Sequence, residues 1–171
     1  PAAISVLTEV LNDLNQEPMV RHEAAEALGA IGASTSLEIL QKFKSDPVVE
    51  VAETCELALE RIKWLQSSEN KSINIKSPYD SVDPAPPSTN HNIQELKKIL
   101  HDENASLFER YRAMFSLRNL KSKEAVEALG SALKCGSALF RHEVAFVLGQ
   151  LQDENGAPFL KESLEDCSEN E

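Results

Sequence analysis

The sequence predicts an all-α protein built from repeated helical hairpins, and three observations support this fold class. Apolar residues recur at helical spacing through most of the chain, aromatic residues make up only 5% of it, and runs of alternating β-branched residues do not occur. Polar, Gly or Pro breaks such as "NQEP" (15–18), "SDP" (45–47) and "CGS" (135–137) separate the apolar segments. Helical hairpins stacked in series form an α-solenoid.

Each expected helix places its apolar residues on one face. In the first part of the chain these residues are Ile4, Leu7 and Leu11; Ala24, Ala27, Leu28 and Ile31; Leu37, Leu40 and Phe43; and Val51, Cys55, Ala58, Leu59 and Ile62. In the second part they are Ile93, Leu96 and Leu100; Met114, Leu117 and Leu120; Val126, Leu129 and Leu133; Val144, Val147, Leu148 and Leu151; and Phe159, Leu160 and Leu164.

The stretch between these parts is rich in Ser, Asn and Pro and has no apolar periodicity. Its prolines at 84, 86 and 87 exclude a helix there. We therefore expect N-terminal repeats at 1–65, an ordered or semi-ordered linker at 66–90 and C-terminal repeats at 91–171.

Composition narrows the classes of function. The formal net charge of −11 argues against nucleic-acid binding, because such a surface repels phosphate, although it would suit a cationic partner. No apolar run is long enough to span a membrane, so no membrane association is expected. The isolated cysteines Cys55, Cys135 and Cys167 have no CxxC spacing and are typical of reduced thiols in a cytoplasmic protein.

The helical segments repeat with a period of 31 residues. The segment that begins at Val20 aligns with the one at Val51, and "YRAMFSLRNL" (111–120) aligns with "HEVAFVLGQL" (142–151). Four helix-pair units result. They resemble a short form of HEAT repeats, like the HEAT-like repeats of bilin lyases.

One position in these units carries unusual chemistry. "VRHEAAEALGAIG" (20–32) and "FRHEVAFVLGQLQ" (140–152) both contain a His-Glu pair, which is His22-Glu23 in the first unit and His142-Glu143 in the fourth. The two middle units have Glu53-Thr54 and Tyr111-Arg112 instead. The fold therefore does not require the pair.

Two interpretations of the pairs stay open from the residues alone. Glu and His near a helix start can complement the helix dipole and cap a neighbouring turn. Alternatively, imidazole and carboxylate are ligands that suit iron, manganese or zinc, and pairs from opposite halves could share a metal centre. His91 and His101 lie outside the repeated position and are expected at the surface, whereas Gly29, Gly130 and Gly149 are expected to permit close helix packing.

Five motifs together closely resemble the deoxyhypusine hydroxylases: "EPMVRHEAAEALGAIG", "DPVVEVAETCELAL", "SPYDSVDPAPP", "LFERYRAMFSLRNL" and "CGSALFRHEVAFVLGQLQ". The resemblance covers nearly the whole chain. It implies a HEAT-repeat monooxygenase in which two irons activate dioxygen. Its implied substrate is the deoxyhypusine side chain of translation initiation factor 5A, which it converts to hypusine. An acidic surface fits such an extended polyamine.

The resemblance also implies roles for the pairs. His22, Glu23 and His142 would be iron ligands, and Glu143 would either bind iron or hold the substrate amine. The family has four His-Glu motifs and this sequence holds two. The 31-residue register places the others beyond both ends, so we expect a fragment of central repeats that is inactive alone. A non-catalytic HEAT-repeat interaction module and a bilin-lyase-like protein are the alternatives.

Overall fold

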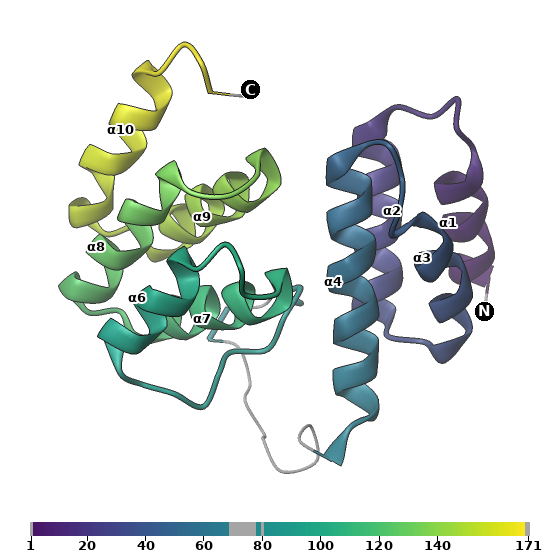
Figure 1. Ribbon diagram of the computed structural model, residues 1–171, viewed down its shortest axis with the longest axis horizontal. Helices are drawn as coiled ribbons and strands as arrows, with labels where there is room; N and C mark the ends of the chain where they lie inside the picture. The colour runs from purple at the N-terminus through teal and green to yellow at the C-terminus, as the bar shows by residue number, and fades with distance from the viewer. Residues whose placement is uncertain (1, 69–77, 80, 170–171) are drawn as a thin grey trace. The chain divides into compact units, whose positions relative to one another are not determined.

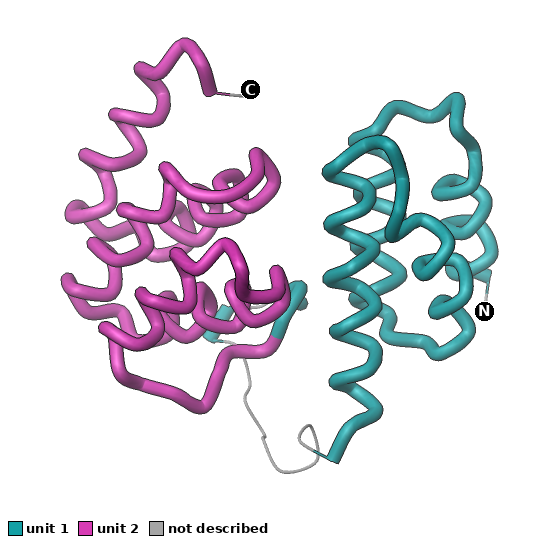
Figure 2. The backbone as a smooth tube through the Cα atoms, in the orientation of Figure 1, with its two compact units in different colours: residues 1–85 teal, residues 86–171 magenta. Residues whose placement is uncertain are grey.

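The computed structural model describes residues 2–68, 78–79 and 81–169. The residues that it describes form helices joined by short connections, without any β-strand, so the all-α prediction is confirmed. The chain divides into two units, residues 1–85 and residues 86–171 (Figure 2). Part of the expected linker, residues 69–77 and 80, lies outside the described residues.

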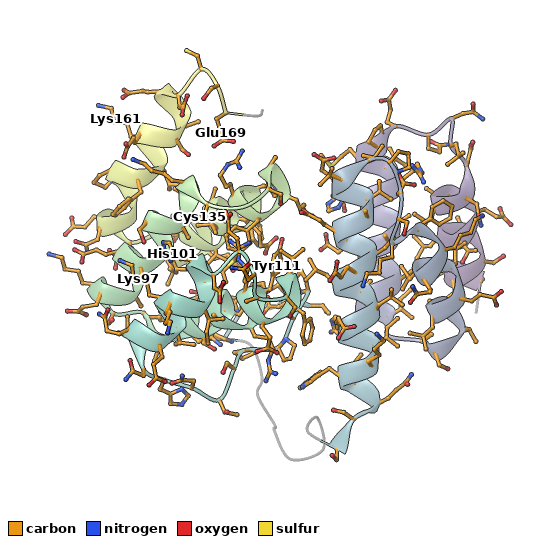
Figure 3. All side chains as sticks on the ribbon, in the orientation of Figure 1. Lys97, His101, Tyr111, Cys135, Lys161 and Glu169 are labelled. Atoms are coloured by element: carbon orange, nitrogen blue, oxygen red, sulfur yellow. The ribbon has the colours of Figure 1, made fainter. Side chains whose placement is uncertain are left out.

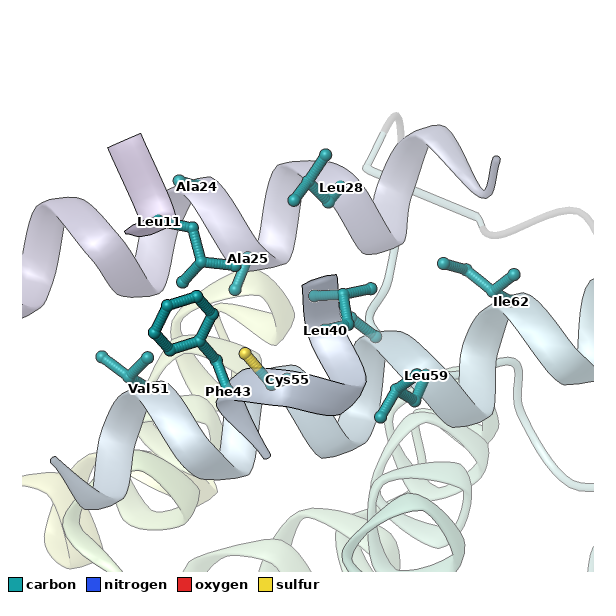
Figure 4. Close-up of a cluster of buried hydrophobic side chains, with 11 residues drawn as sticks. Leu11, Ala24, Ala25, Leu28, Leu40, Phe43, Val51, Cys55, Leu59 and Ile62 are labelled. Carbon is teal, nitrogen blue, oxygen red and sulfur yellow. The ribbon is translucent and has the colours of Figure 1, made fainter. Parts of the chain in front are cut away.

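Unit 1 consists of two helical hairpins (Figure 1). Its helices are α1 (Ala2–Asn12), α2 (Pro18–Ile31), α3 (Leu37–Phe43, after a 3-10 turn at Ser34–Ser36) and α4 (Val49–Gln66). Helix α2 packs against both α1 and α4, and α3 packs against α4. The core between them contains Leu11, Ala24, Ala25, Leu28, Leu40, Phe43, Val51, Cys55, Ala58, Leu59 and Ile62 (Figure 4). The apolar spacing of the sequence thus identified the buried face of each helix.

Unit 2 repeats this arrangement. Its helices are α6 (Ile93–His101), α7 (Leu107–Leu120), α8 (Lys123–Ser131, continued by a 3-10 turn at Ala132–Lys134), α9 (Ala138–Leu151) and, after a 3-10 turn at Glu154–Gly156, α10 (Ala157–Glu165). At the start of α6, α7, α8 and α9 a side-chain oxygen of the capping residue accepts a hydrogen bond from a backbone N–H of the first turn; the capping residues are Asn92, Ser106, Ser122 and Ser137. Each such cap typically stabilises a helix by about 1 kcal/mol. Local sequence therefore fixes where these helices begin.

The 31-residue period reappears in the helix starts. Helices α2 and α4 begin at 18 and 49, and α7 and α9 begin at 107 and 138. An arginine at the fourth position of α2, α7 and α9 donates a guanidinium N–H to a backbone carbonyl earlier in the chain. The pairs are Arg21 with Leu11, Arg110 with Leu100, and Arg141 with Gly136. The repeats therefore share internal contacts as well as length.

Glycine permits close helix packing at two of the three expected positions. A Cβ atom added to Gly29 would lie 2.7 Å from the Cβ atom of Ala58, so α2 and α4 approach closely there. Gly130 faces the ring of Phe159, which an added Cβ atom would meet at 2.4 Å. For Gly149 the expectation was wrong, because this residue is exposed and an added Cβ atom would meet nothing within 4 Å.

The exposure of three further side chains, those of His101, Ile31 and Leu164, differs from what the sequence predicts. The expectation that His101 lies at the surface was wrong, because it is half-buried in unit 2 (Figure 3). Its Nδ1 lies 2.8 Å from the carbonyl oxygen of Lys97, and its Nε2 lies 3.1 Å from Oγ of Ser131. Ile31 and Leu164 keep helical spacing but are 47% and 87% exposed, since both lie near helix ends.

Residues 78–79 and 81–90 of the expected linker are not helical, whereas Gln66 at its start still belongs to α4. Residues of this segment contact helices that precede and follow it in the sequence. The guanidinium Nε of Arg61 donates to the carbonyl of Asp83. The hydroxyl of Ser116 in α7 lies 3.2 Å from the carbonyl oxygen of Ser88. The two units divide between Ala85 and Pro86, inside the 66–90 segment, and the finer boundaries at 65 and 91 stay predictions.

Candidate metal centre

His22 is held at the interface between two helices of unit 1. It is the fifth residue of α2 and only 8% exposed. Its Nδ1 lies 2.6 Å from Oγ1 of Thr54, a buried residue of α4. Thr54 also donates to the carbonyl of Glu50 one turn earlier, at 2.7 Å. The imidazole ring is therefore fixed on one side by the neighbouring repeat.

The other ring nitrogen of His22 faces two carboxylates. Its Nε2 lies 3.9 Å from Oε1 of Glu23 and 3.7 Å from Oε2 of Glu26. Both distances exceed a hydrogen bond, so these carboxylates do not engage Nε2 directly. The side chains of Glu23 and Glu26 are 68% and 43% exposed. Imidazole nitrogen and carboxylate oxygen are ligand types that suit a divalent cation of the first transition row, although within the described residues these side chains do not form a group of three that could hold a metal ion.

The second pair lies in unit 2, on α9. His142 is the fifth residue of this helix, as His22 is in α2, and it is exposed, whereas Glu143 is half-buried. Among the residues that the structure describes, His142 makes no hydrogen bond or ion pair, in contrast to His22. Three or more metal-ligating side chains do not come together within the described residues. Each unit thus contains one His-Glu pair.

The two middle repeats fill the same position with structural residues. Tyr111 is the fifth residue of α7, is 1% exposed, and packs edge to face against Phe115 and Phe140. Glu53 is the fifth residue of α4, next to Thr54. The position therefore accepts a core aromatic side chain, so a histidine there is not needed for folding.

Sequence reasoning missed two residues of this site, Thr54 and Glu26. Thr54 occupies the position of Glu23 one repeat later. Alignment of the repeats therefore shows it only as a position where the carboxylate is absent, and does not indicate that it contacts His22. A contact across 32 residues has no local signal. Glu26 follows His22 by four residues, and this helical spacing could have identified it.

Comparison with known proteins places this geometry in context. A family model of HEAT repeats matches residues 1–60 and 93–171. The deoxyhypusine hydroxylase of Drosophila melanogaster is 59% identical over 99% of this chain and 56% of its own length. That of Homo sapiens is 56% identical over 98% of this chain and 55% of its own length.

A solved structure of human deoxyhypusine hydroxylase in complex with glycerol matches with a TM-score of 0.92 and 56% identity, covering 99% of this chain and 58% of that one. The chain thus spans little more than half the length of the relatives that it matches. None of its described helices is both long and apolar enough to cross a membrane.

Proposed function

The chain belongs to the HEAT-repeat family, and from this premise we propose that it is part of a deoxyhypusine monooxygenase. Its substrate would be the deoxyhypusine side chain of translation initiation factor 5A. Similarity to deoxyhypusine hydroxylases at 55–59% identity over nearly the whole chain supports this proposal. The observation that carries it is the geometry of His22, a buried histidine that the fold does not require and whose Nε2 faces two carboxylates.

Iron is the proposed metal, and the residues of unit 1 fit it. Imidazole nitrogen and carboxylate oxygen are ligands that non-haem iron takes in proteins. His22 would offer its Nε2, and Glu23 would offer an accessible carboxylate 3.9 Å away. His142 and Glu143 of unit 2 are the other proposed metal-binding residues. When bound, iron would supply the activation of dioxygen; with two electrons from an external reductant and two protons, one oxygen atom would enter a substrate C–H bond and the other would leave as water.

The polypeptide would bind and orient a cationic substrate. Deoxyhypusine carries an extended polyamine, and the formal net charge of −11 favours the approach of such a chain. Glu143 is half-buried, so its carboxylate would be desolvated enough to hold an ammonium group more firmly than a fully exposed one. A cytoplasmic location belongs to the proposal, and the free thiols of Cys55, Cys135 and Cys167 favour it.

A hybrid enzyme tests this function. Residues 1–171 of this chain replace the matching segment of human deoxyhypusine hydroxylase, which is 56% identical. The hybrid is incubated with iron, dioxygen, a small-molecule reductant that supplies two electrons per turnover, and the deoxyhypusine form of the initiation factor, and mass spectrometry detects the gain of one oxygen atom. We expect hydroxylation by the hybrid and its loss after His22→Ala. The control is His91→Ala, an exposed histidine outside the pairs, which should leave the rate unchanged. A folded, iron-loaded hybrid that does not hydroxylate the substrate contradicts the proposal.

A further inference from the structure

We propose that Thr54 is a positioning residue that fixes the tautomer and orientation of His22, so that only Nε2 can accept a metal ion. The proposal deepens the function proposed above, on which its metal-binding part rests. Its tautomer part depends only on the contacts of the folded chain. Thr54 itself does not touch the metal, since it lies on the Nδ1 side of the ring.

The number of hydrogens at Thr54 decides the direction of its bond to His22. A threonine hydroxyl has one hydrogen and two lone pairs. That hydrogen goes to the carbonyl of Glu50, at an Oγ1–O distance of 2.7 Å. Oγ1 must then accept from His22, at 2.6 Å, so Nδ1 carries a hydrogen. A neutral imidazole has one N–H, and its lone pair is therefore on Nε2.

The reverse arrangement loses a bond. If Thr54 donated to Nδ1, the carbonyl of Glu50 would lose its hydrogen bond from the hydroxyl, and one fewer hydrogen bond would form. Nε2 would then carry the hydrogen and could not bind a metal. A protonated imidazole also donates from Nδ1 to Thr54, and loss of its Nε2 hydrogen leaves the neutral form whose lone pair is on Nε2.

The surroundings of Thr54 hold this geometry. Threonine is branched at Cβ, so its side chain has few rotamers in a helix. Thr54 is 4% exposed and lies at the interface of α4 with α2. One turn further along α4, Ala58 packs so closely on Gly29 of α2 that a Cβ atom added to Gly29 would lie 2.7 Å from that of Ala58. Both hydrogen-bonding side chains therefore stand on rigid elements, as a positioned metal ligand requires.

Nitrogen-15 NMR of the histidine side chains in the metal-free chain tests the tautomer. At about pH 9 a solvated imidazole is neutral, and the spectrum shows which ring nitrogen carries the hydrogen. We expect Nδ1–H for His22 in the wild type and in Thr54→Ser, which keeps the hydroxyl. Thr54→Val has a similar shape without it, and His22 should change to Nε2–H. The internal control is His142, whose signals should not move in any variant. Wild-type His22 with Nε2–H, or an unchanged spectrum in Thr54→Val, overturns the inference.

Titration of the hybrid enzyme described above with ferrous ion under anaerobic conditions tests the consequence for metal binding, and its unsubstituted form is the wild type of this comparison. Removing a partner that orients a ligating histidine typically weakens affinity 10- to 100-fold. We expect this loss in Thr54→Val and recovery in Thr54→Ser, with unfolding midpoints measured to confirm folding. Equal affinity in the wild type and Thr54→Val contradicts the positioning role. Absence of ferrous binding by the wild type counts against the proposed function, while the NMR result still decides the role of Thr54.

Discussion

Arg21 and Asp46 form a buried ion pair that joins two parts of unit 1. The Nη2 atom of Arg21 lies 2.5 Å from Oδ2 of Asp46, and the two side chains are 4% and 1% exposed. Nη1 contacts the other carboxylate oxygen at 3.3 Å, so the contact is bidentate. Nε of the same arginine donates to the carbonyl of Leu11. The pair therefore connects the end of α1, the start of α2 and the turn before α4.

Removing one partner of this pair should destabilise the protein strongly. Asp46→Ala leaves the Arg21 guanidinium buried without its counter-charge, which typically costs about 3–5 kcal/mol. The matched control is Glu60→Ala, which breaks an ion pair with Lys63 whose side chains are 38% and 57% exposed. We expect that control to change the free energy of unfolding by less than about 1 kcal/mol. Urea denaturation measures both, and similar losses in the two variants contradict the structural role of Asp46.

The same pair should make stability depend on pH under acidic conditions. Burial acts to raise the pKa of Asp46, but hydrogen bonds from Arg21 and from the backbone N–H of Val48, with the charge of Arg21, lower it below 3.8. A carboxyl group whose pKa is lower in the folded than in the unfolded protein stabilises the fold at pH values above its unfolded pKa. This stabilisation is lost as the pH falls through the folded pKa. The difference in unfolding free energy between wild type and Asp46→Asn should therefore shrink below about pH 4. A constant difference between about pH 7 and pH 2 contradicts this assignment.

Two glycines in equivalent positions should respond oppositely to alanine. Gly29→Ala places a Cβ atom 2.7 Å from that of Ala58 and forces α2 from α4, so we expect a loss of about 1–3 kcal/mol. Gly149→Ala meets nothing within 4 Å and should be neutral or stabilise by up to about 1 kcal/mol, because alanine favours helix. Thermal unfolding of both variants checks this. Stabilisation by Gly29→Ala is incompatible with the close helix contact.

The cysteines should differ in their reactivity. Cys55 is fully buried, and burial, with a contribution from the charge of Asp46, raises the pKa of its thiol to about 12 against the opposing charge of Arg21. Cys167 is exposed. In native protein at about pH 8 a thiol reagent should modify Cys167 quickly and Cys55 only after urea is added. Peptide mapping identifies the modified residues, and rapid native labelling of Cys55 is the contrary result.

Much of the fold could be predicted because burying one face of a helix leaves a periodic pattern in the sequence. The residues at helical spacing in α4, from Val51 to Ile62, are buried in the structure. The register also follows from sequence, since equivalent helices must begin at equivalent intervals to stack. The sequence does not show that Gly149 has free space around it while Gly29 is covered. This difference depends on whether another helix lies against the glycine.

The candidate site was predictable only in part. His22 and His142 could be found because the same pair recurs in one register position. Thr54 could not be found from the sequence, because no motif indicates the 2.6 Å contact that its hydroxyl makes with His22 of the preceding repeat. Repetition in a sequence identifies equivalent positions, whereas the partners of a side chain depend on packing in three dimensions.

The iron content of the purified hybrid enzyme tests most directly whether the two His-Glu pairs hold iron, as proposed. We expect His22→Ala and His142→Ala each to lower the iron content to less than about half of the parent hybrid, because each removes an imidazole ligand. His91→Ala should retain it, and circular dichroism should show that all variants fold. Full iron content in both His22→Ala and His142→Ala would contradict the account.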